Sequence, residues 1–126
     1  MVRTLSRFAV FILFSLVVAG TATAQDPLTV GPKIYKKILE NERVRMMEVT
    51  FAPGDSIAMH SHPDHAVYAV TGGKLRVTTS DGKTQVAELK AGDPIWFPAV
   101  KHAAKNIGTT HLKLLVVELK EKPAMK

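Results

Sequence analysis

The sequence predicts an all-β domain, either a sandwich or a barrel, and two observations support this. From Glu42 onward, about seven or eight short runs rich in apolar and β-branched residues are separated by turn residues every ~8–12 positions. No stretch after Asn41 has helical periodicity long enough to compete with that pattern. The chain has 126 residues, of which 46% are hydrophobic and 22% are charged. This length and balance indicate one globular domain rather than two.

The N-terminal residues are typical of a secretory signal peptide. Two arginines precede the apolar run of residues 8–20, and residues 22–24 (Ala-Thr-Ala) are the small residues of a cleavage site. The apolar run is shorter than the ~20 residues that span a bilayer, which disfavours an uncleaved anchor. We therefore expect residues 1–24 to be removed. The mature protein would be periplasmic or secreted, with no stable membrane anchor after cleavage.

The mature chain begins with a lead-in, residues 25–41, that has no clear pattern. Residues 25–32 are polar and contain proline and glycine, whereas residues 34–41 are compatible with one helical turn or with an irregular edge. The β-rich domain is expected to cover residues 42–120, and residues 121–126 form a C-terminal tail.

Within the β-rich domain, most runs end at glycine or proline. The clearest turn is Asp81-Gly82, which joins residues 75–79 to residues 84–89, because Asp-Gly favours the tight turns of β-hairpins. The remaining expected strands are residues 44–51, 66–71, 95–98, 102–107 and 112–119.

The composition excludes several classes of protein. Seventeen basic and 11 acidic residues give a formal charge of +6, but the lysines are scattered. Nucleic-acid binding would need a basic stripe with interleaved aromatic residues, so none is expected. The chain has no cysteine, which excludes disulfides, cysteine-based zinc sites and cysteine nucleophiles. No serine–histidine–acid arrangement or phosphate-binding loop is recognisable either.

Histidines are the residues that point to a function. His60 and His62 stand two positions apart, so in a strand their side chains lie on the same face. Neutral imidazole is the commonest metal ligand among side chains, and two on one face form half of a site. His102, which follows two expected hairpins, is the candidate for a third ligand. An exposed polar pair is the alternative interpretation of His60 and His62.

Glycines, histidines and a proline recur with the spacing of two known motifs. The first consists of Gly54, five residues, His60-Ser61-His62 and a later Gly73. The second consists of Gly92, five residues, Pro98, a short loop, His102, three residues and Asn106. In this order they resemble the two motifs of the cupin superfamily, and the resemblance covers residues 54–106.

This resemblance implies a jelly-roll β-barrel, the double-stranded β-helix, with His60, His62 and His102 as ligands of a divalent ion. The ion would be Fe, Mn, Ni, Cu or Zn. Ala66 stands where the family has a glutamate ligand, and Val100 stands where a glycine is usual. The site is therefore similar to the three-histidine sites of some cupin dioxygenases, and equally to cupins that have lost their metal.

Residues near the motifs have two interpretations each. If alternation continues, Ala66 shares a face with His60 and His62, and His65 faces the other way. Pro63 can interrupt that alternation, so His65 and Asp64 stay open as substitutes for the missing glutamate. Tyr68 and Val70 are expected to face inward with Ala66, and one of Trp96 and Phe97 is expected to face inward. His111 is expected to be an exposed turn residue. Glu48 and Glu118 are expected to face outward rather than to support a metal-bound imidazole.

Three functions follow from this sequence. The first is a metal-dependent enzyme, such as a dioxygenase acting on a small anionic substrate, because three neutral ligands leave the ion's charge uncompensated. The second is a non-catalytic module that binds or senses a small ligand. The third is a structural cupin without metal. The family resemblance also implies pairing through edge strands, and hence a homodimer.

Overall fold

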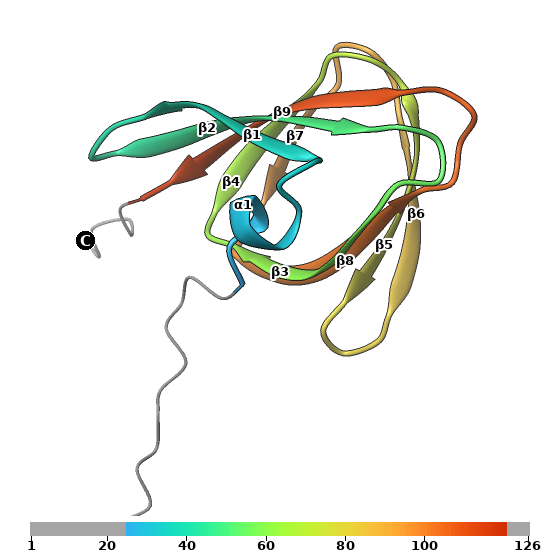
Figure 1. Ribbon diagram of the computed structural model, residues 1–126, viewed down its shortest axis with the longest axis horizontal. Helices are drawn as coiled ribbons and strands as arrows, with labels where there is room; N and C mark the ends of the chain where they lie inside the picture. Colours follow the sequence, from blue (N-terminus) through green and yellow to red (C-terminus); the bar gives the residue numbers. More distant parts are fainter. Residues whose placement is uncertain (1–24, 121–126) are drawn as a thin grey trace, which may run out of the picture.

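The computed structural model describes residues 25–120, so the expected signal peptide (residues 1–24) and tail (residues 121–126) lie outside the described residues. Figure 1 shows their arrangement. The described part of the chain contains one short helix and nine strands: α1 (Pro27–Val30), β1 (Tyr35–Glu40), β2 (Val44–Phe51), β3 (Ser56–His62), β4 (His65–Ala69), β5 (Gly73–Thr79), β6 (Thr84–Leu89), β7 (Pro94–Phe97), β8 (Val100–Asn106) and β9 (Leu112–Leu119).

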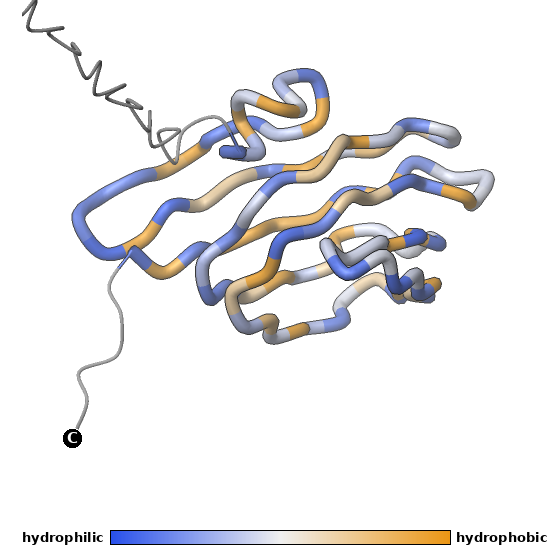
Figure 2. Tube along the Cα trace, turned by 90° about the horizontal axis from the view of Figure 1, so that it is seen from below, coloured by the Kyte–Doolittle hydropathy of each residue, from blue (hydrophilic) through white to orange (hydrophobic). Residues whose placement is uncertain are grey.

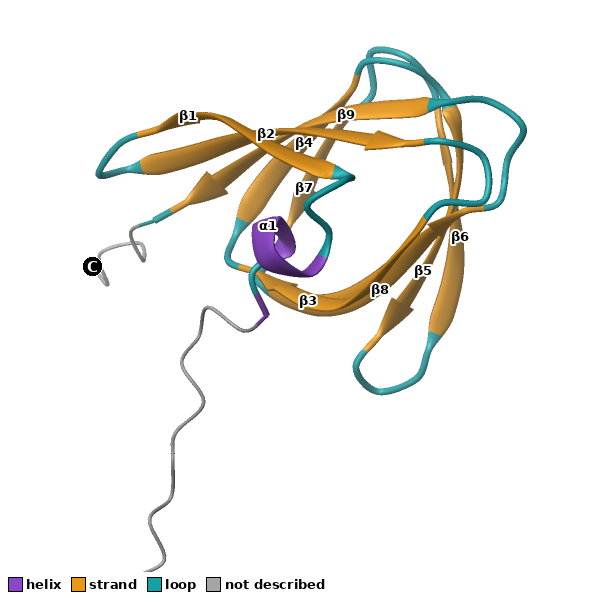
Figure 3. Cartoon of the chain, in the orientation of Figure 1, coloured by secondary structure: helices purple, strands orange, loops and turns teal. Residues whose placement is uncertain are grey.

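The strands form two antiparallel sheets that enclose the interior (Figures 1 and 3). The five-stranded sheet has the order β1-β2-β9-β4-β7, and the four-stranded sheet has the order β3-β8-β5-β6. Chain neighbours such as β3 and β4 lie in different sheets, whereas β2 pairs with β9 from the far end of the chain. The all-β prediction is confirmed.

Local sequence explains several element boundaries. The strands expected at residues 44–51, 84–89 and 112–119 have the same bounds in the structure. Gly82 has a φ of 85°, which is the left-handed conformation that the hairpin between β5 and β6 requires. Gly92 has a φ of 92° in the turn before β7.

Alternation along the strands builds the core. Figure 2 shows hydrophobic and hydrophilic residues alternating along much of the chain trace, as expected for strands with one buried face. On β9, for example, Leu112, Leu114 and Val116 are buried. The other buried hydrophobic residues are Ile34, Tyr35, Met47, Val49, Phe51, Ile57, Val67, Ala69, Leu75 and Ala104.

The lead-in is part of the packed structure. Of the two alternatives for residues 34–41, the edge is correct, because β1 pairs with β2 at the border of the five-stranded sheet. A short helix lies earlier, at α1, where the Asp26 side chain accepts a hydrogen bond from the Leu28 amide. Figure 1 shows α1 between β1 and β3. Within residues 25–120, no helix has the length and apolar character needed to cross a bilayer.

Alternation does not continue from β3 into β4. The chain changes sheet at Pro63-Asp64, so the faces in β4 are reset. His65, Val67 and Ala69 are buried, whereas Ala66 and Tyr68 are exposed. The expectation that Ala66, Tyr68 and Val70 face inward is therefore wrong, as is the expectation that His65 faces outward.

Candidate metal centre

His60, His62 and His102 meet in the interior, as the spacing predicted. His60 and His62 lie on β3, and the register of β3 with β8 places His102 directly opposite His60. One ligand atom from each of the three lies within 4.8 Å of the others. His60 and His62 are buried, and His102 is half-buried. Sequence-distant strands therefore bring three imidazoles to one point.

Hydrogen bonds determine which ring nitrogen of each β3 histidine is available. The Nδ1 atom of His60 lies 2.8 Å from the carbonyl oxygen of Ala58. The Nδ1 atom of His62 lies 2.6 Å from Oε1 of Glu118. Because a carbonyl and a carboxylate accept hydrogen bonds, both Nδ1 atoms carry the proton and donate it. In the neutral rings, each Nε2 therefore has a free lone pair.

These two lone pairs face each other. The Nε2 atoms of His60 and His62 are 3.0 Å apart, and neither neutral ring has a proton to place between them. Such a contact requires a shared proton or a cation. Two nitrogens bound ~2.1 Å from one ion and at right angles to each other lie about 3 Å apart. The donor set and this spacing fit a divalent metal ion.

Burial keeps the imidazoles in the form that binds metal. Loss of hydration lowers the pKa of His60 to about 4 and that of His102 to about 3. Burial also lowers the pKa of His65. At neutral pH these rings are uncharged and have a lone pair to donate.

Glu118 contacts the cluster through His62 and holds its imidazole in place. Its Oε1 accepts the hydrogen bond from His62, and its Oε2 lies 2.7 Å from Nη2 of Arg45. Arg45 also forms an ion pair with Asp26, in which Nη1 of Arg45 lies 2.6 Å from Oδ2 of Asp26. The expectation of an outward Glu118 is wrong, because β9 is apolar on both faces and its pattern does not reveal which face is buried. Glu48, by contrast, is only half-buried and lies 3.6 Å from Lys113.

Tyr35 is a site residue that the sequence did not indicate. It begins β1, and its hydroxyl lies 3.4 Å from Nε2 of His62. Burial, followed by the nearby Glu118 carboxylate, raises the pKa of this hydroxyl, so it stays protonated. An isolated tyrosine in a lead-in without a clear pattern carries no signal of this role.

His65 lies beside the cluster but is not one of its three converging residues. Its ring centroid is 4.7 Å from that of His62, and it stacks on Phe97 at 5.3 Å. Its Nδ1 donates to the Pro63 carbonyl oxygen, which leaves Nε2 as an acceptor. Asp64 instead accepts a hydrogen bond from the Ala99 amide, as a turn residue does. His111 is exposed, as expected.

A cavity of about 70 Å³ adjoins the histidines. Its lining residues are uncharged, apart from any proton on a histidine: Tyr35, Phe51, His62, His65, Val67, Leu75, Val77, Ala87, Leu89, Ile95, Phe97, His102, Ala104, Leu114 and Val116. Phe97 is in this lining and Trp96 is not, which confirms that one of the pair faces inward.

Comparisons with known proteins agree with this architecture. The family model of the cupin domain matches residues 47–118. A cupin domain from Bordetella pertussis is 30% identical, with a TM-score of 0.65 over 70% of this chain and 93% of that one. A comparison with curated proteins found no match.

Two further structures share the fold at lower identity. An RmlC-like cupin with a double-stranded β-helix from Methanocaldococcus jannaschii is 20% identical, with a TM-score of 0.58 over 68% of this chain and 78% of that one. The polyketide cyclase RemF from Streptomyces resistomycificus is 24% identical, with a TM-score of 0.54 over 71% of this chain and 66% of that one. With its two-sheet jelly roll, its histidine cluster and a family match over more than half its length, the chain belongs to the cupin family.

Proposed function

We propose that this protein is an exported cupin that binds one divalent first-row ion through His60, His62 and His102 and acts as a metal-dependent enzyme of the dioxygenase type on a small anionic substrate. The observation that carries the metal proposal is the 3.0 Å contact between the Nε2 atoms of His60 and His62. Both Nδ1 protons are donated elsewhere, so this contact needs a shared proton or a cation between the two nitrogens, and a divalent ion would supply that charge.

The chain's own residues hold and orient the ligands. The Ala58 carbonyl oxygen sets the tautomer of His60, and Glu118 sets that of His62. A bound ion would supply Lewis acidity, and a redox-active one would also supply electron transfer. Three protein ligands leave coordination positions for a small molecule.

Two further residues are placed to contact that molecule. Tyr35 can donate a hydrogen bond from its hydroxyl, and His65 can accept one at Nε2. Both line the cavity beside His62. They would orient the bound molecule by opposite hydrogen-bonding roles.

The size and lining of the cavity favour a substrate that is small and anionic. About 70 Å³ is well below the ~300–1,000 Å³ of pockets for drug-sized ligands, so the molecule has only a few non-hydrogen atoms. The lining has no carboxylate to compensate an ion's charge, and the ligands themselves are neutral. An anion that coordinates the ion would supply that compensation.

Non-catalytic binding or sensing of a small ligand is the second candidate function. It is favoured by the same lining, which is mostly aliphatic and which, outside the three proposed ligands, offers only His65 as a general base. A structural cupin without metal is the third outcome that an experiment must distinguish.

The export proposal rests on residues 1–24 of the sequence. One preparation tests export and metal together. The protein is purified from its export compartment, its N-terminus is sequenced, and its metal content is measured by elemental analysis. We expect the sequence to begin at Gln25, with one ion per chain. The full chain in the membrane fraction would contradict export.

Histidine variants test whether the ion is bound at the three converging imidazoles. His102→Ala should lose stoichiometric binding, because residues 25–120 bring no fourth ligand atom to the cluster that could compensate for the lost imidazole. His111→Ala removes an exposed histidine and should retain the ion. A wild-type protein that takes up no ion across the first-row series at neutral pH would leave the structural role as the answer.

A cobalt-loaded sample and an oxygen electrode separate the first two functions. Azide should change the visible spectrum of the cobalt protein if the ion has open positions. A panel of small carboxylic acids should then be tested for oxygen uptake by the protein as purified with its own metal. Uptake that His102→Ala abolishes supports the enzyme, whereas azide binding without any uptake supports the binding module.

A further inference from the structure

The segment before β1 packs closely against the strand that carries two of the histidines. Residues 25–34, which we call the strap, contain α1, and Figure 1 shows α1 between β1 and β3. Gly31 approaches β3 so closely that a Cβ atom on it would collide with the buried side chain of Ile57. Leu28 and Val30 pack against the hydrophobic core. The strap is therefore fitted to the barrel.

Side chains, rather than sheet hydrogen bonds, attach the strap to the barrel. The amides of residues 29–31 donate to the carbonyl oxygens of Asp26 and Pro27, within the strap itself. A helix of four residues has little stability of its own, because helix nucleation is unfavourable. Residues 26–31 therefore depend on side-chain contacts to stay docked, and they can detach without breaking either sheet.

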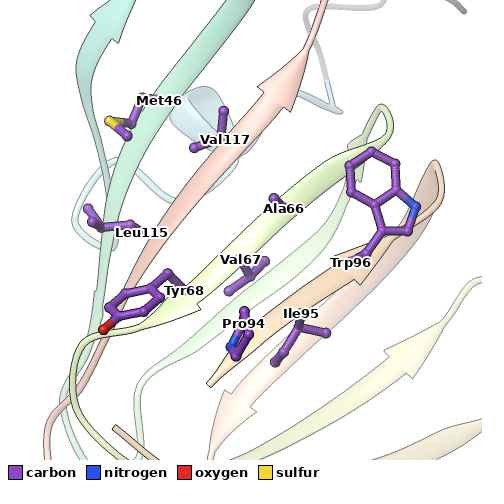
Figure 4. Close-up of a pocket in the computed structure, with 9 residues that line it drawn as sticks. All are labelled: Met46, Ala66, Val67, Tyr68, Pro94, Ile95, Trp96, Leu115 and Val117. Carbon is purple, nitrogen blue, oxygen red and sulfur yellow. The ribbon is translucent and has the colours of Figure 1, made fainter. Parts of the chain in front are cut away.

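Two charged residues on the inner face of the five-stranded sheet connect to the cluster. Met46 on β2 and Val117 on β9 line a groove of about 450 Å³ on the outer face (Figure 4). Because side chains alternate along a strand, their neighbours Arg45 and Glu118 lie on the inner face, where the register pairs them directly. Nε and Nη2 of Arg45 lie 2.8 and 2.7 Å from Oε2 of Glu118, whose Oε1 accepts the proton of His62.

Asp26 joins the strap to this pair of residues. Its Oδ2 lies 2.6 Å from Nη1 of Arg45, and its Oδ1 accepts the hydrogen bond of the Leu28 amide that caps α1. Partial burial acts to raise the pKa of the Asp26 carboxyl, but the hydrogen bonds from Arg45 and Leu28 outweigh it and hold the pKa below its usual value. Asp26 is therefore ionised at neutral pH, and hydrogen bonds connect the strap to His62 without a break.

Both ends of the strap also contact the surroundings of His62. At one end, the Oε1 of Gln25 accepts a hydrogen bond from the hydroxyl of Ser61, the residue that precedes His62 on β3. At the other end, the strap leads directly into Tyr35, whose hydroxyl lies 3.4 Å from Nε2 of His62. Docking of the strap thus affects His62 from more than one side.

We propose that Asp26 is a positioning residue of the metal centre, acting through Arg45 and Glu118, so that docking of the strap and binding of the ion strengthen each other. This inference rests on the metal binding proposed above. Asp26, Arg45 and Glu118 together carry one negative charge, and without Asp26 they carry none.

The physical reason is competition for the Glu118 carboxylate. Arg45 draws the negative charge of Glu118 away from His62, and Asp26 offsets this by pairing with Arg45. A stronger acceptor at Nδ1 raises the basicity of the imidazole and hence its affinity for a metal ion. By linkage, an ion that binds more tightly when the strap is docked must also keep the strap docked.

Cobalt titrations of the purified protein, freed of its own ion by chelation, test the effect of Asp26 on binding. Asp26→Asn keeps a good cap for α1, because Asn and Asp are equally favoured there, but it loses the charge. We expect the affinity for Co²⁺, followed by its visible absorption, to fall about fivefold, which is the lower end of typical coupling. Asp55→Asn is the matched control. It changes an exposed carboxylate that accepts the Ala52 amide in the turn before β3, and it should bind Co²⁺ as the wild type does.

Asp26→Glu separates positioning of the metal centre from capping of the helix. Glutamate keeps the charge but is not among the residues favoured as helix caps. If the charge acts through Arg45, Asp26→Glu should bind Co²⁺ more tightly than Asp26→Asn. The opposite order would show that Asp26 only stabilises α1, and it would overturn the proposal.

Hydrogen exchange followed by mass spectrometry tests the reciprocal effect of the ion on the strap. In the wild type, exchange in peptides from residues 25–34 should slow about fivefold or more when Co²⁺ binds, because linkage gives both effects the same factor. Exchange in the hairpin turn at residues 80–83 should not change. In Asp26→Asn, the slowing of strap exchange should be smaller than in the wild type.

The outcomes distinguish this inference from the metal proposal. If the wild type binds Co²⁺ but Asp26→Asn binds it equally well, or strap exchange does not respond to the ion, the inference is wrong and the metal centre stands. If the wild type binds neither Co²⁺ nor any other first-row ion, both proposals are wrong.

Discussion

Glu118 is not one of the three converging residues, yet it determines which nitrogen of His62 faces the cluster. Its carboxylate accepts the Nδ1 proton at 2.6 Å and is itself paired with Arg45. In metal sites, such an outer carboxylate holds the imidazole in one tautomer and raises its basicity. At the scale of single residues, the site therefore depends on a residue that does not coordinate the ion.

Replacing this carboxylate should weaken metal binding without removing a ligand. Glu118→Gln keeps the shape of the side chain but loses its charge, so we expect affinity to fall about 10- to 100-fold. Competition with a metal chelator of known affinity measures the change. Glu48→Gln is the matched control, since Glu48 lies on the adjacent strand and its partner is the half-exposed Lys113. Equal affinities for the wild type and Glu118→Gln would contradict the supporting role.

At the scale of elements, Asn106 shows why the second motif ends in asparagine. It closes β8 and is fully buried. Its amide nitrogen donates to the carbonyl oxygens of Phe51 and Thr110, and its Oδ1 accepts from the Gly108 amide. One side chain thus joins the end of β2 to the loop between β8 and β9.

Removing that side chain should destabilise the whole domain. Asn106→Ala leaves buried backbone groups without partners, and each such group costs ~1–3 kcal/mol, so we expect a loss of at least ~2 kcal/mol in the free energy of unfolding. Urea unfolding measures it. Asn41→Ala is the control, because Asn41 makes two hydrogen bonds in an exposed hairpin and should cost about 1 kcal/mol or less. Similar losses in both variants would argue against a special role for Asn106.

At the scale of the whole molecule, burial of the histidines couples folding to pH. His60 and His102 have pKa values of about 4 and about 3 in the fold, against 6.5 for an unperturbed histidine. Below pH 6.5 the unfolded chain binds protons that the folded chain does not. The free energy of unfolding contributed by these groups therefore falls as the pH is lowered from 6.5 toward the folded values, and it is constant above 6.5.

The metal-free protein should consequently lose stability between pH ~6.5 and ~4, and urea unfolding at several pH values measures the slope. Acidic groups add their own dependence, so the comparison is between variants. His102→Gln should flatten the slope because it removes one group with a lowered pKa. His111→Gln, at an exposed position, should leave the slope as in the wild type. Identical slopes for all three proteins would contradict the burial argument.

Local pattern was sufficient for much of this fold. Alternation and turn chemistry placed β2, β6 and β9 at their observed bounds. The resemblance of the glycine and histidine spacing to the two cupin motifs implied the jelly roll and the three imidazoles that converge in it. The strand bounds and the turns are encoded within a few residues of each position, because the period of a strand and the conformation of a turn are local properties.

Only the tertiary structure decided the surroundings of the cluster. His65 faces inward because the chain changes sheet at Pro63-Asp64, and alternation carries no information across such a change. Tyr35 and Glu118 reach His62 from opposite parts of the chain, through pairings of β1 and β9 with β2. Strand alternation limits a side chain to one of two faces. Which face is enclosed, and what lies across it, depends on contacts between segments that are distant in sequence.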